Sequence, residues 1–193
     1  MYLTKKLYQI AEVQFGLYKK KSKNGDVKYL TSSHFDDYLN PTLFDNNSCI
    51  TLKDKDTKFM LQPNDVILAG KGQRIFAWAY DESFGDVVPS SLFYILRPNS
   101  NEVNGYYLAS LLNSSRKQYE LELIGSGSSI TSIAKKELLD LEIPVPSLQE
   151  QHRITQVLKL LDDEIMISSE ILDKKRALRK GVLNELITNK TRV

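Results

Sequence analysis

The sequence predicts an α+β protein, with a mixed domain of short strands and helices over residues 1–146 and one long helix after it. Residues 1–146 alternate β-branched and aromatic runs with Gly, Asn, Asp and Pro, a pattern typical of short strands joined by turns. Residues 147–188 contain one Gly and no Pro, and their apolar residues recur at helical spacing. This change in composition predicts two domains, 1–146 and 147–193, with the boundary near Pro146.

The first domain is expected to hold more strand than helix. Its short apolar runs bounded by turn residues predict strands at 27–33, 65–72, 75–80 and 91–98. A helix is expected over 103–115, because its Tyr and Leu residues share one apolar face. A shorter helix at 134–139 precedes a further strand at 141–146.

The second domain begins with a capping box, because Ser147 can accept a hydrogen bond from the backbone of Glu150 while Glu150 reaches back to Ser147. No helix breaker follows until Gly181, which predicts a helix of about 40 residues, roughly 60 Å long. Steps of three and four residues mark an apolar stripe along it. The residues expected to form an interface there are Leu158, Leu161, Ile165, Leu172, Val182 and Leu186.

The apolar stripe must be shielded from water by another surface, and a helix from a second copy of the chain or from a related protein is the simplest partner. The alternative is that the stripe folds back on the chain's own first domain.

Length and composition exclude several classes of protein. A chain of 193 residues with 41% hydrophobic residues can bury a core. Cys49 is the only cysteine, which excludes an internal disulfide and a multi-cysteine zinc site and suggests a buried small hydrophobe. Neither a signal peptide nor an apolar run of membrane-spanning length is present, so the expected location is cytoplasmic. The formal charge of +2 does not by itself indicate a nucleic-acid surface.

Two glycine-containing loops are candidate contact sites for nucleic acid. In residues 68–73, the glycines on either side of Lys71 allow a close approach to a phosphate, although the loop lacks the spacing of a nucleotide-binding P-loop. Residues 125–131 offer hydroxyl groups and backbone NH groups for phosphates or base edges. The alternatives are an ordinary hairpin turn for the first loop and a flexible connector for the second.

Two further segments have the same potential. Lysines gather around a turn in residues 18–28, where they could contact a DNA backbone or simply be solvated. Ser32, Ser33 and His34 follow a predicted strand, where they either reach base edges or form a capped turn. The full set of expected DNA contacts is Lys19, Lys21, Lys71, Gln73, Arg74, Ser126, Ser128, Ser129 and Thr131, with the lysines on phosphates and Gln73 or Arg74 on base edges.

Catalysis finds little support in the sequence. The best nuclease-like match joins Asp45 to the Asp56-Thr57-Lys58 run, without a convincing strand pair to hold a metal. His34 and His152 are isolated from other candidate ligands. We therefore expect no enzyme activity, no metal site and no cofactor.

Several segments together resemble the specificity subunits of type I restriction-modification systems. They are, in order, KKLYQIAEVQFG, LQPNDVILAGKGQ, VVPSSLFYILRPN, GYYLASLLNS, the run from GSGSSITSIAKK through IPVPSLQEQHRI into the long helix, and LRKGVLNELITNK. The resemblance implies a DNA-reading target-recognition domain at 1–146, similar to that of a DNA adenine methyltransferase. It also implies a conserved helix that forms an antiparallel coiled coil and docks modification subunits. Methyl transfer, ATP hydrolysis and cleavage would belong to separate modification and restriction subunits.

A standard member of that family carries two recognition domains and two conserved helices, whereas one of each is visible in this sequence. We therefore expect a homodimer that reads an interrupted palindrome in double-stranded DNA, with the spacer set by helix length. The alternative is a truncated specificity-like interaction protein that binds modification subunits and modulates or blocks the system.

Overall fold

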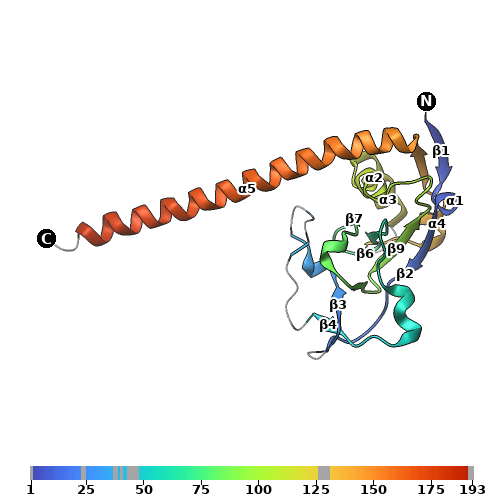
Figure 1. Cartoon of the computed structure of the whole chain (residues 1–193), viewed down its shortest axis with the longest axis horizontal. Helices are drawn as coiled ribbons and strands as arrows, with labels where there is room; N and C mark the ends of the chain where they lie inside the picture. The colour runs from blue at the N-terminus through green and yellow to red at the C-terminus, as the bar shows by residue number, and fades with distance from the viewer. Residues whose placement is uncertain are drawn as a thin grey trace. The chain divides into compact units, whose positions relative to one another are not determined.

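The computed structural model describes residues 2–22, 25–36, 39, 41–42, 48–125 and 131–190, and Figure 1 shows the chain. The chain divides into two compact units, Met1–His152 and Arg153–Val193. The first unit is a mixed α+β domain, and the second continues helix α5 (Leu148–Lys190). The predicted fold class is therefore confirmed.

Besides α5, the first unit has the following elements in chain order. The strands are β1 (Leu3–Lys6), β2 (Ala11–Phe15), β3 (Val27–Leu30), β4 (Cys49–Ile50), β5 (Val66–Ala69), β6 (Lys71–Gly72), β7 (Ala77–Ala79), β8 (Val87–Pro89), β9 (Phe93–Pro98), β10 (Thr131–Ser132) and β11 (Glu142–Val145). The α-helices are α1 (Leu7–Ile10), α2 (Gly105–Leu112), α3 (Ser115–Gly125) and α4 (Lys135–Leu139). Short 3₁₀ turns in the described part of the unit are η1 (Ser32–His34), η2 (Asp54–Phe59) and η3 (Glu82–Phe84).

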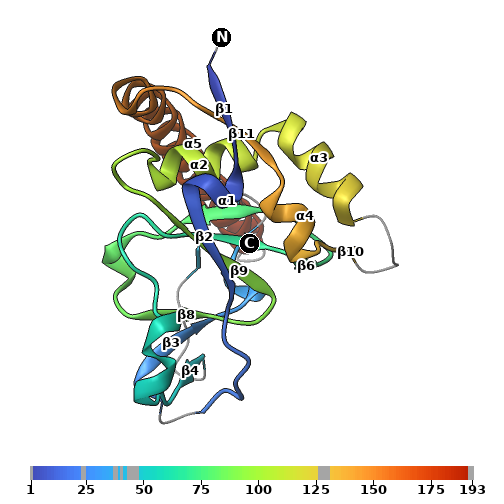
Figure 2. The same ribbon diagram turned by 90° about the vertical axis from the view of Figure 1, so that its right-hand side faces the viewer.

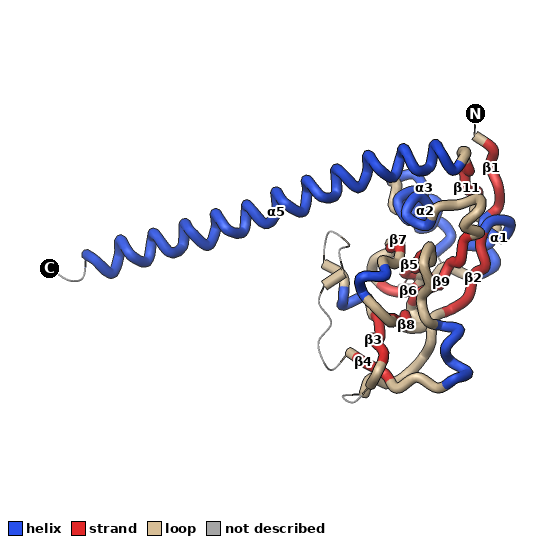
Figure 3. The backbone as a smooth tube through the Cα atoms, in the orientation of Figure 1, coloured by secondary structure: helices blue, strands red, loops and turns tan. Residues whose placement is uncertain are grey.

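The centre of the domain is an antiparallel sheet in the order β2-β9-β5-β7 (Figure 3). All four residues of β5 are buried, because both faces of the sheet are covered. Val66 and Leu68 contribute to one apolar cluster, while Ile67 and Ala69 contribute to another. This alternation is the period of two that a strand imposes on its side chains. The predicted strands 65–72, 75–80 and 91–98 thus supply neighbouring strands of one sheet.

Helix α2 packs on the first of these faces through the buried side chains of Leu108 and Leu112. The helix predicted over 103–115 is shorter than expected, because it ends at Leu112 and the chain starts α3 at Ser115. The Asn113 side chain between them accepts a hydrogen bond from Ala77 N and donates one to Ala77 O, both at 2.8 Å. Asn113 therefore satisfies backbone groups of the edge strand β7. Helix α3 was not predicted, because its apolar periodicity is weak.

A smaller sheet in the order β4-β3-β8 contains a parallel pair, β3 with β8, and an antiparallel pair, β3 with β4. Val27, Tyr29, Ile50 and Val88 form its apolar cluster. The strand predicted over 27–33 ends at Leu30, because the next residues turn into η1. Cys49 is half-buried on β4 rather than buried, as its position at the edge of this sheet allows.

The predicted strand at 141–146 is present as β11, and its antiparallel partner is β1 (Figure 2). The start of α5 is held to the same unit by Gln151, whose side chain is completely buried. Its Nε2 donates to Glu102 O and Pro146 O, both at 2.9 Å, and its Oε1 accepts from Asn104 N at 2.8 Å. Asn104 in turn caps α2 through Tyr107 N. One glutamine thus ties the beginnings of two helices together.

Helix α5 is 43 residues long and runs through Gly181 without a break. Glu150 N donates to Ser147 Oγ at 3.3 Å, which is the first half of the predicted capping box. Apolar residues from Val157 to Ile187 are exposed along the helix, including Leu161 at 48% and Leu186 at 62%. Among the residues that the structure describes, the helices are all too short or too polar to span a bilayer.

Candidate nucleic-acid interface

The two glycine-containing loops singled out in the sequence meet in space. Strand β6 pairs antiparallel with β10, so that Thr131 lies opposite Gly72 and Ser132 lies opposite Lys71. The two segments are about sixty residues apart in the sequence, and only the fold brings them together. Ser126, Ser128 and Ser129 lie outside the described residues, whereas the backbone of Thr131 pairs with Gly72.

The base of this strand pair is locked into the domain. Gly70 N donates to Leu92 O at 3.1 Å, and Ile133 N donates to Gly70 O at 2.9 Å. Tyr94 Oη donates to Ile133 O at 2.7 Å, and burial raises the pKa of Tyr94, which keeps the phenol protonated as a donor. A Cβ atom at Gly70 would lie 2.4 Å from the Tyr94 ring, so packing requires this glycine.

Gly72 has a different reason to be glycine. Its φ of 132° is disfavoured for residues with side chains, although a Cβ atom there would meet nothing within 4 Å. The backbone of Gly72 therefore faces open space, where a phosphate can approach closely. Of the two glycines proposed for phosphate contact, Gly72 has this geometry and Gly70 does not.

Lys71 lies beside exposed apolar groups. Its Nζ is 5.4 Å from the centroid of the Phe15 ring, and the Phe15 ring lies 4.5 Å from that of Tyr94. Phe15 is 41% exposed and Leu92 is 40% exposed. An ammonium group next to exposed apolar side chains suits DNA, because it offers charge to a phosphate and apolar area to a sugar or a thymine methyl group. We call Phe15, Lys71, Gly72, Gln73 and Leu92 the β6–β10 surface.

Sequence reasoning missed Phe15 and Leu92. Phe15 stands opposite Tyr94 in the β2–β9 pair, and Leu92 accepts a backbone hydrogen bond from Gly70, the residue before Lys71. These contacts join segments that are far apart in the chain, so no local pattern marks them.

Arg74 and Gln73 differ in the contacts that their side chains make within the domain. Arg74 donates to the carbonyl groups of Asp36 at 3.1 Å and Phe35 at 3.3 Å, and its guanidinium lies 5.7 Å from the Phe76 ring centroid. Gln73 is exposed at the end of β6. A base contact by Arg74 would have to replace bonds that it already makes, so Gln73 is the better placed of the two predicted base readers.

The lysines of the 18–28 segment also have unequal surroundings. Lys19 Nζ forms an ion pair with Asp56 Oδ2 at 3.2 Å, and the Lys19 side chain is largely covered. Lys19 N also donates to Tyr29 Oη at 3.2 Å. Lys21 is exposed. Lys19 therefore compensates a buried carboxylate, and Lys21 is the better candidate for a phosphate.

His34 is buried, which favours the capped turn over contact with base edges. Its Nδ1 accepts from Thr31 N at 3.0 Å, which leaves the ring proton on Nε2 to be donated to Ser48 Oγ at 2.9 Å. The segment is the capped turn considered as the alternative. The histidine fastens η1 to the segment that leads into β4.

The nuclease-like run also has a structural use. Asp56 lies on the 3₁₀ turn η2, not on a strand, and its carboxylate is engaged by Lys19. Asp45 lies outside the described residues. Within the described ranges, no group of three or more His, Cys, Asp or Glu side chains is arranged to hold a metal ion.

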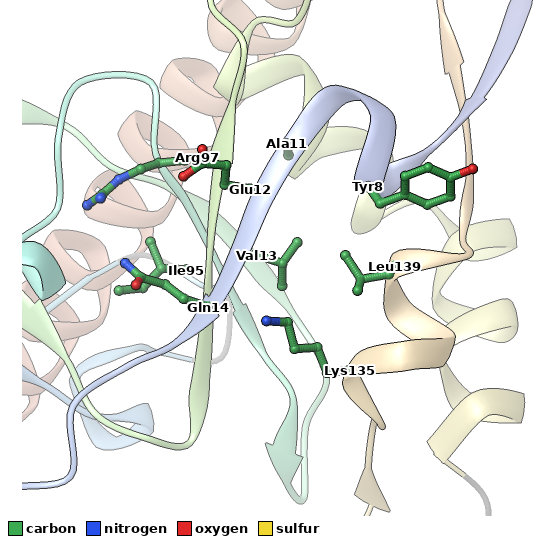
Figure 4. Close-up of a pocket in the computed structure, with 9 residues that line it drawn as sticks. All are labelled: Tyr8, Ala11, Glu12, Val13, Gln14, Ile95, Arg97, Lys135 and Leu139. Carbon is green, nitrogen blue, oxygen red and sulfur yellow. The ribbon is translucent and has the colours of Figure 1, made fainter.

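A shallow cavity of about 470 Å³ lies between β2, β9 and α4, and Figure 4 shows the side chains that line it. Arg97 lines the cavity and contacts Asp65, with its Nε 3.1 Å from Asp65 Oδ2, and it also donates to Met60 O at 2.7 Å. Burial raises the pKa of Asp65, and the hydrogen bond from Gln62 N and the charge of Arg97 partly offset this effect. Arg97, one of the two basic residues that line the cavity, thus stabilises a buried carboxylate of the fold.

The comparisons with known proteins agree with one another. Residues 2–174 match the family model of the type I restriction modification DNA specificity domain. Two proteins of Methanocaldococcus jannaschii named as type I restriction enzyme specificity subunits, MjaX and MjaVIII, are each 31% identical over 98 and 94 residues, respectively. These matches cover 51% and 49% of this chain and 23% and 22% of the relatives, so the aligned part is less than a quarter of their length.

Solved structures of the same kind share the fold. The S subunit of a type I restriction-modification system from M. genitalium superposes with a TM-score of 0.64 at 18% identity, over 93% of this chain and 44% of that one. The HsdS subunit from Thermoanaerobacter tengcongensis gives 0.58 at 19% identity, over 86% and 38%. The relatives are named as specificity subunits, in agreement with the prediction of a non-catalytic recognition subunit. The chain belongs to the type I restriction modification DNA specificity domain family.

Proposed function

We propose that this chain reads a specific DNA sequence for a type I restriction-modification complex and that it does so as a homodimer on an interrupted palindrome. The observation that carries the DNA-reading part is the β6–β10 surface. There, Lys71 and Gly72 pair with β10, the Lys71 ammonium lies over the exposed Phe15 ring, and the backbone of Gly72 is open. Charge, backbone NH groups and apolar area in one place are what a DNA duplex requires.

The contacts divide by role. Lys71 and Lys21 contact phosphates, which adds affinity that is independent of sequence. Gln73 contacts base edges, together with the predicted Ser126, Ser128, Ser129 and Thr131. Arg74 and Lys19 act as supports, because their charged groups already bind Phe35, Asp36 and Asp56. This chain performs no chemistry and needs no cofactor; methyl transfer, ATP hydrolysis and cleavage lie on the modification and restriction subunits with which it assembles.

The dimer is supported by the exposed stripe of α5. Leu161, Ile165, Leu172, Val182 and Leu186 are each about half exposed or more, and Leu158 is half-buried. Apolar side chains at heptad spacing are stable in water when a second helix covers them. Two copies would present two identical recognition domains, and identical domains read identical half-sites.

The test is selection of bound duplexes from a random-sequence library by the 193-residue chain, alone and with its modification subunits. We expect enrichment of one short sequence repeated in inverted orientation around a spacer of constant length. Affinity should fall steeply with salt, because lysine–phosphate contacts release counterions. Failure to enrich any sequence in both arms would overturn the proposal, and enrichment of a single unrepeated half-site would overturn the dimeric reading alone.

A second candidate function is an interaction protein that occupies modification subunits without reading DNA. It is favoured by the apolar residues outside the stripe, since Leu160, Ile167 and Leu178 are also more than half exposed. Capture of modification subunits by a chain that selects no DNA in either arm would favour this candidate.

A further inference from the structure

The β6–β10 surface is built on a two-stranded ribbon. Gly72 pairs with Thr131 and Lys71 pairs with Ser132, and Figure 2 shows the two strands side by side. The major groove of DNA admits a ribbon of this kind, and in that groove each base pair presents a distinct pattern of donors, acceptors and methyl groups. The side chains around the ribbon therefore indicate which bases it can distinguish.

Gln73 carries a side-chain amide that the fold leaves unused. It follows β6 directly and is exposed, and within the described part of the chain its amide makes no hydrogen bond. An amide presents a hydrogen-bond acceptor and a donor side by side. Adenine presents the complementary pair in the major groove, a donor at N6 and an acceptor at N7, so that one amide can bind it through two hydrogen bonds.

Phe15 and Leu92 offer apolar area beside the same ribbon. The Phe15 ring centroid lies 5.4 Å from Lys71 Nζ, and the Leu92 carbonyl accepts a hydrogen bond from Gly70 N, the residue before Lys71. The two residues are 41% and 40% exposed. The C5 methyl of thymine is the apolar group that a base presents in the major groove. Contact with thymine would cover these side chains, whereas cytosine offers a polar amino group at its edge instead.

The groups that would read a G·C pair are missing from this surface or already engaged. Guanine is bound best by an arginine or a lysine, and cytosine by a carboxylate. Arg74 is held by the carbonyl groups of Phe35 and Asp36, and none of the residues that define the β6–β10 surface is acidic. Lys71 is a compact charge that suits a phosphate. An amide and two apolar side chains remain to select bases.

We infer that Gln73 binds an adenine in the major groove and that Phe15 and Leu92 contact a thymine methyl group, so that the β6–β10 surface selects an A·T pair in each half-site. This assignment rests on the proposed function and adds the bases to it. The thymine belongs to the same pair or to a neighbouring one, because the adenine and thymine edges of one pair lie side by side in the groove.

The choice of groove has a consequence of its own. In the minor groove, A·T and T·A present the same acceptors, so a side chain there could not tell them apart. In the major groove the two orientations differ. Reversal of the selected pair from A·T to T·A should therefore weaken binding of the wild-type chain about as much as its replacement by G·C.

Exchange of Gln73 tests the base that it reads, by selection of duplexes from a random library with the 193-residue chain and its modification subunits. The wild type should enrich adenine at one position of the half-site, and Gln73→Ala should lose the preference at that position alone. Gln73→Glu should change the preference to cytosine, because a carboxylate accepts from cytosine N4. Gln156→Glu makes the same charge change at an exposed residue of α5 and should select the wild-type sequence.

Base analogues test the single groups that are contacted. Replacement of the selected adenine by 7-deazaadenine removes the N7 acceptor, and we expect it to weaken binding of the wild type about fivefold and binding of Gln73→Ala not at all. Uracil in place of the contacted thymine removes the methyl group. It should weaken binding of the wild type about fourfold and leave binding of the Phe15→Ala/Leu92→Ala double variant unchanged.

Circular dichroism checks that each variant keeps the wild-type fold. A wild-type half-site without an A·T pair, an unchanged half-site in both Gln73 variants, or equal losses from the analogues in wild-type and variant chains would overturn the base assignment while DNA reading stands. Binding that is insensitive to reversal of the pair would do the same. Failure of the wild type to enrich any sequence, alone or with modification subunits, would overturn the proposed function itself.

Discussion

At the scale of single residues, several polar side chains that resemble functional residues in the sequence instead hold the domain together. His34, Lys19 and Arg74 each had a possible role at DNA, and each makes contacts within the fold. Lys71 differs, because its neighbour is an exposed aromatic ring rather than a carboxylate or a carbonyl group. A cation that is not neutralised by a protein anion can neutralise a phosphate.

Replacement of Lys71 by Ala should lower affinity for the selected DNA by about tenfold and reduce the slope of log affinity against log salt by about one, as for loss of one phosphate contact. Replacement of Phe15 by Ala should lower affinity without changing that slope, because the ring carries no charge. Fluorescence anisotropy across a salt series measures both effects. Lys55→Ala, which removes an exposed lysine on η2, is the control. Equal losses of DNA affinity in the Lys71 and Lys55 variants would show that Lys71 contributes no more to binding than another exposed lysine.

Loss of the Gln151 side chain should destabilise the domain. Its three hydrogen bonds join α5, the loop before α2 and the N-cap of α2. Gln151→Leu keeps the volume but leaves buried backbone groups unpaired, at about 1–3 kcal/mol each, so we expect a loss of about 3 kcal/mol. Urea unfolding of the whole chain measures this change, with exposed Gln156→Leu as the control. A loss below about 1 kcal/mol would contradict the assigned network.

At the scale of elements, two glycines in structured positions should respond to alanine in opposite directions. At Gly70 the new Cβ would press on the buried Tyr94 ring, and overpacking of this kind costs about 1–3 kcal/mol. At Gly181, within the C-terminal half of α5, a Cβ would meet nothing within 4 Å, and Gly→Ala in a helix interior stabilises by about 1 kcal/mol. Thermal unfolding followed by circular dichroism separates the two variants. Destabilisation by Gly181→Ala would show that its outer face is covered.

At the scale of the whole molecule, buried tyrosines should set the alkaline limit of stability. Burial raises the pKa of Tyr29, Tyr94 and Tyr107 above the ordinary value of about 10. The folded state then keeps protons that the unfolded state releases. The stability they contribute is fully present below about pH 10 and is lost as pH rises through the folded-state pKa values.

We therefore expect the free energy of unfolding to be flat from pH 8 to pH 9 and to fall as pH rises above about 10. Tyr94→Phe removes one of the buried phenols, so its stability should fall less steeply over that range. Tyr18→Phe, at a side chain that is 88% exposed, is the control and should keep the wild-type slope. Urea titrations at several pH values measure these slopes, and identical slopes for Tyr94→Phe and the wild type would contradict the burial argument.

The elements were predictable to the extent that their signals are local. The apolar runs at 65–72 and 91–98 became β5 and β9, because a strand buried on both faces must be apolar throughout. The capping residue Ser147 and the lack of breakers located α5. Helix α3 was missed because it buries little apolar surface, and β1 was missed because its partner β11 lies about 140 residues away.

The sequence by itself determined the fold class and the long helix with its apolar stripe, because each is a matter of residue type and spacing along one chain. Only the tertiary structure decided which polar residues are used internally and which stay available. It buried His34, paired Lys19 with Asp56, and brought Phe15 to Lys71 and Leu92 to the neighbouring Gly70. The reason is physical: a contact surface is assembled from segments that pair across the sheet, and such pairing leaves no periodic trace in the chain.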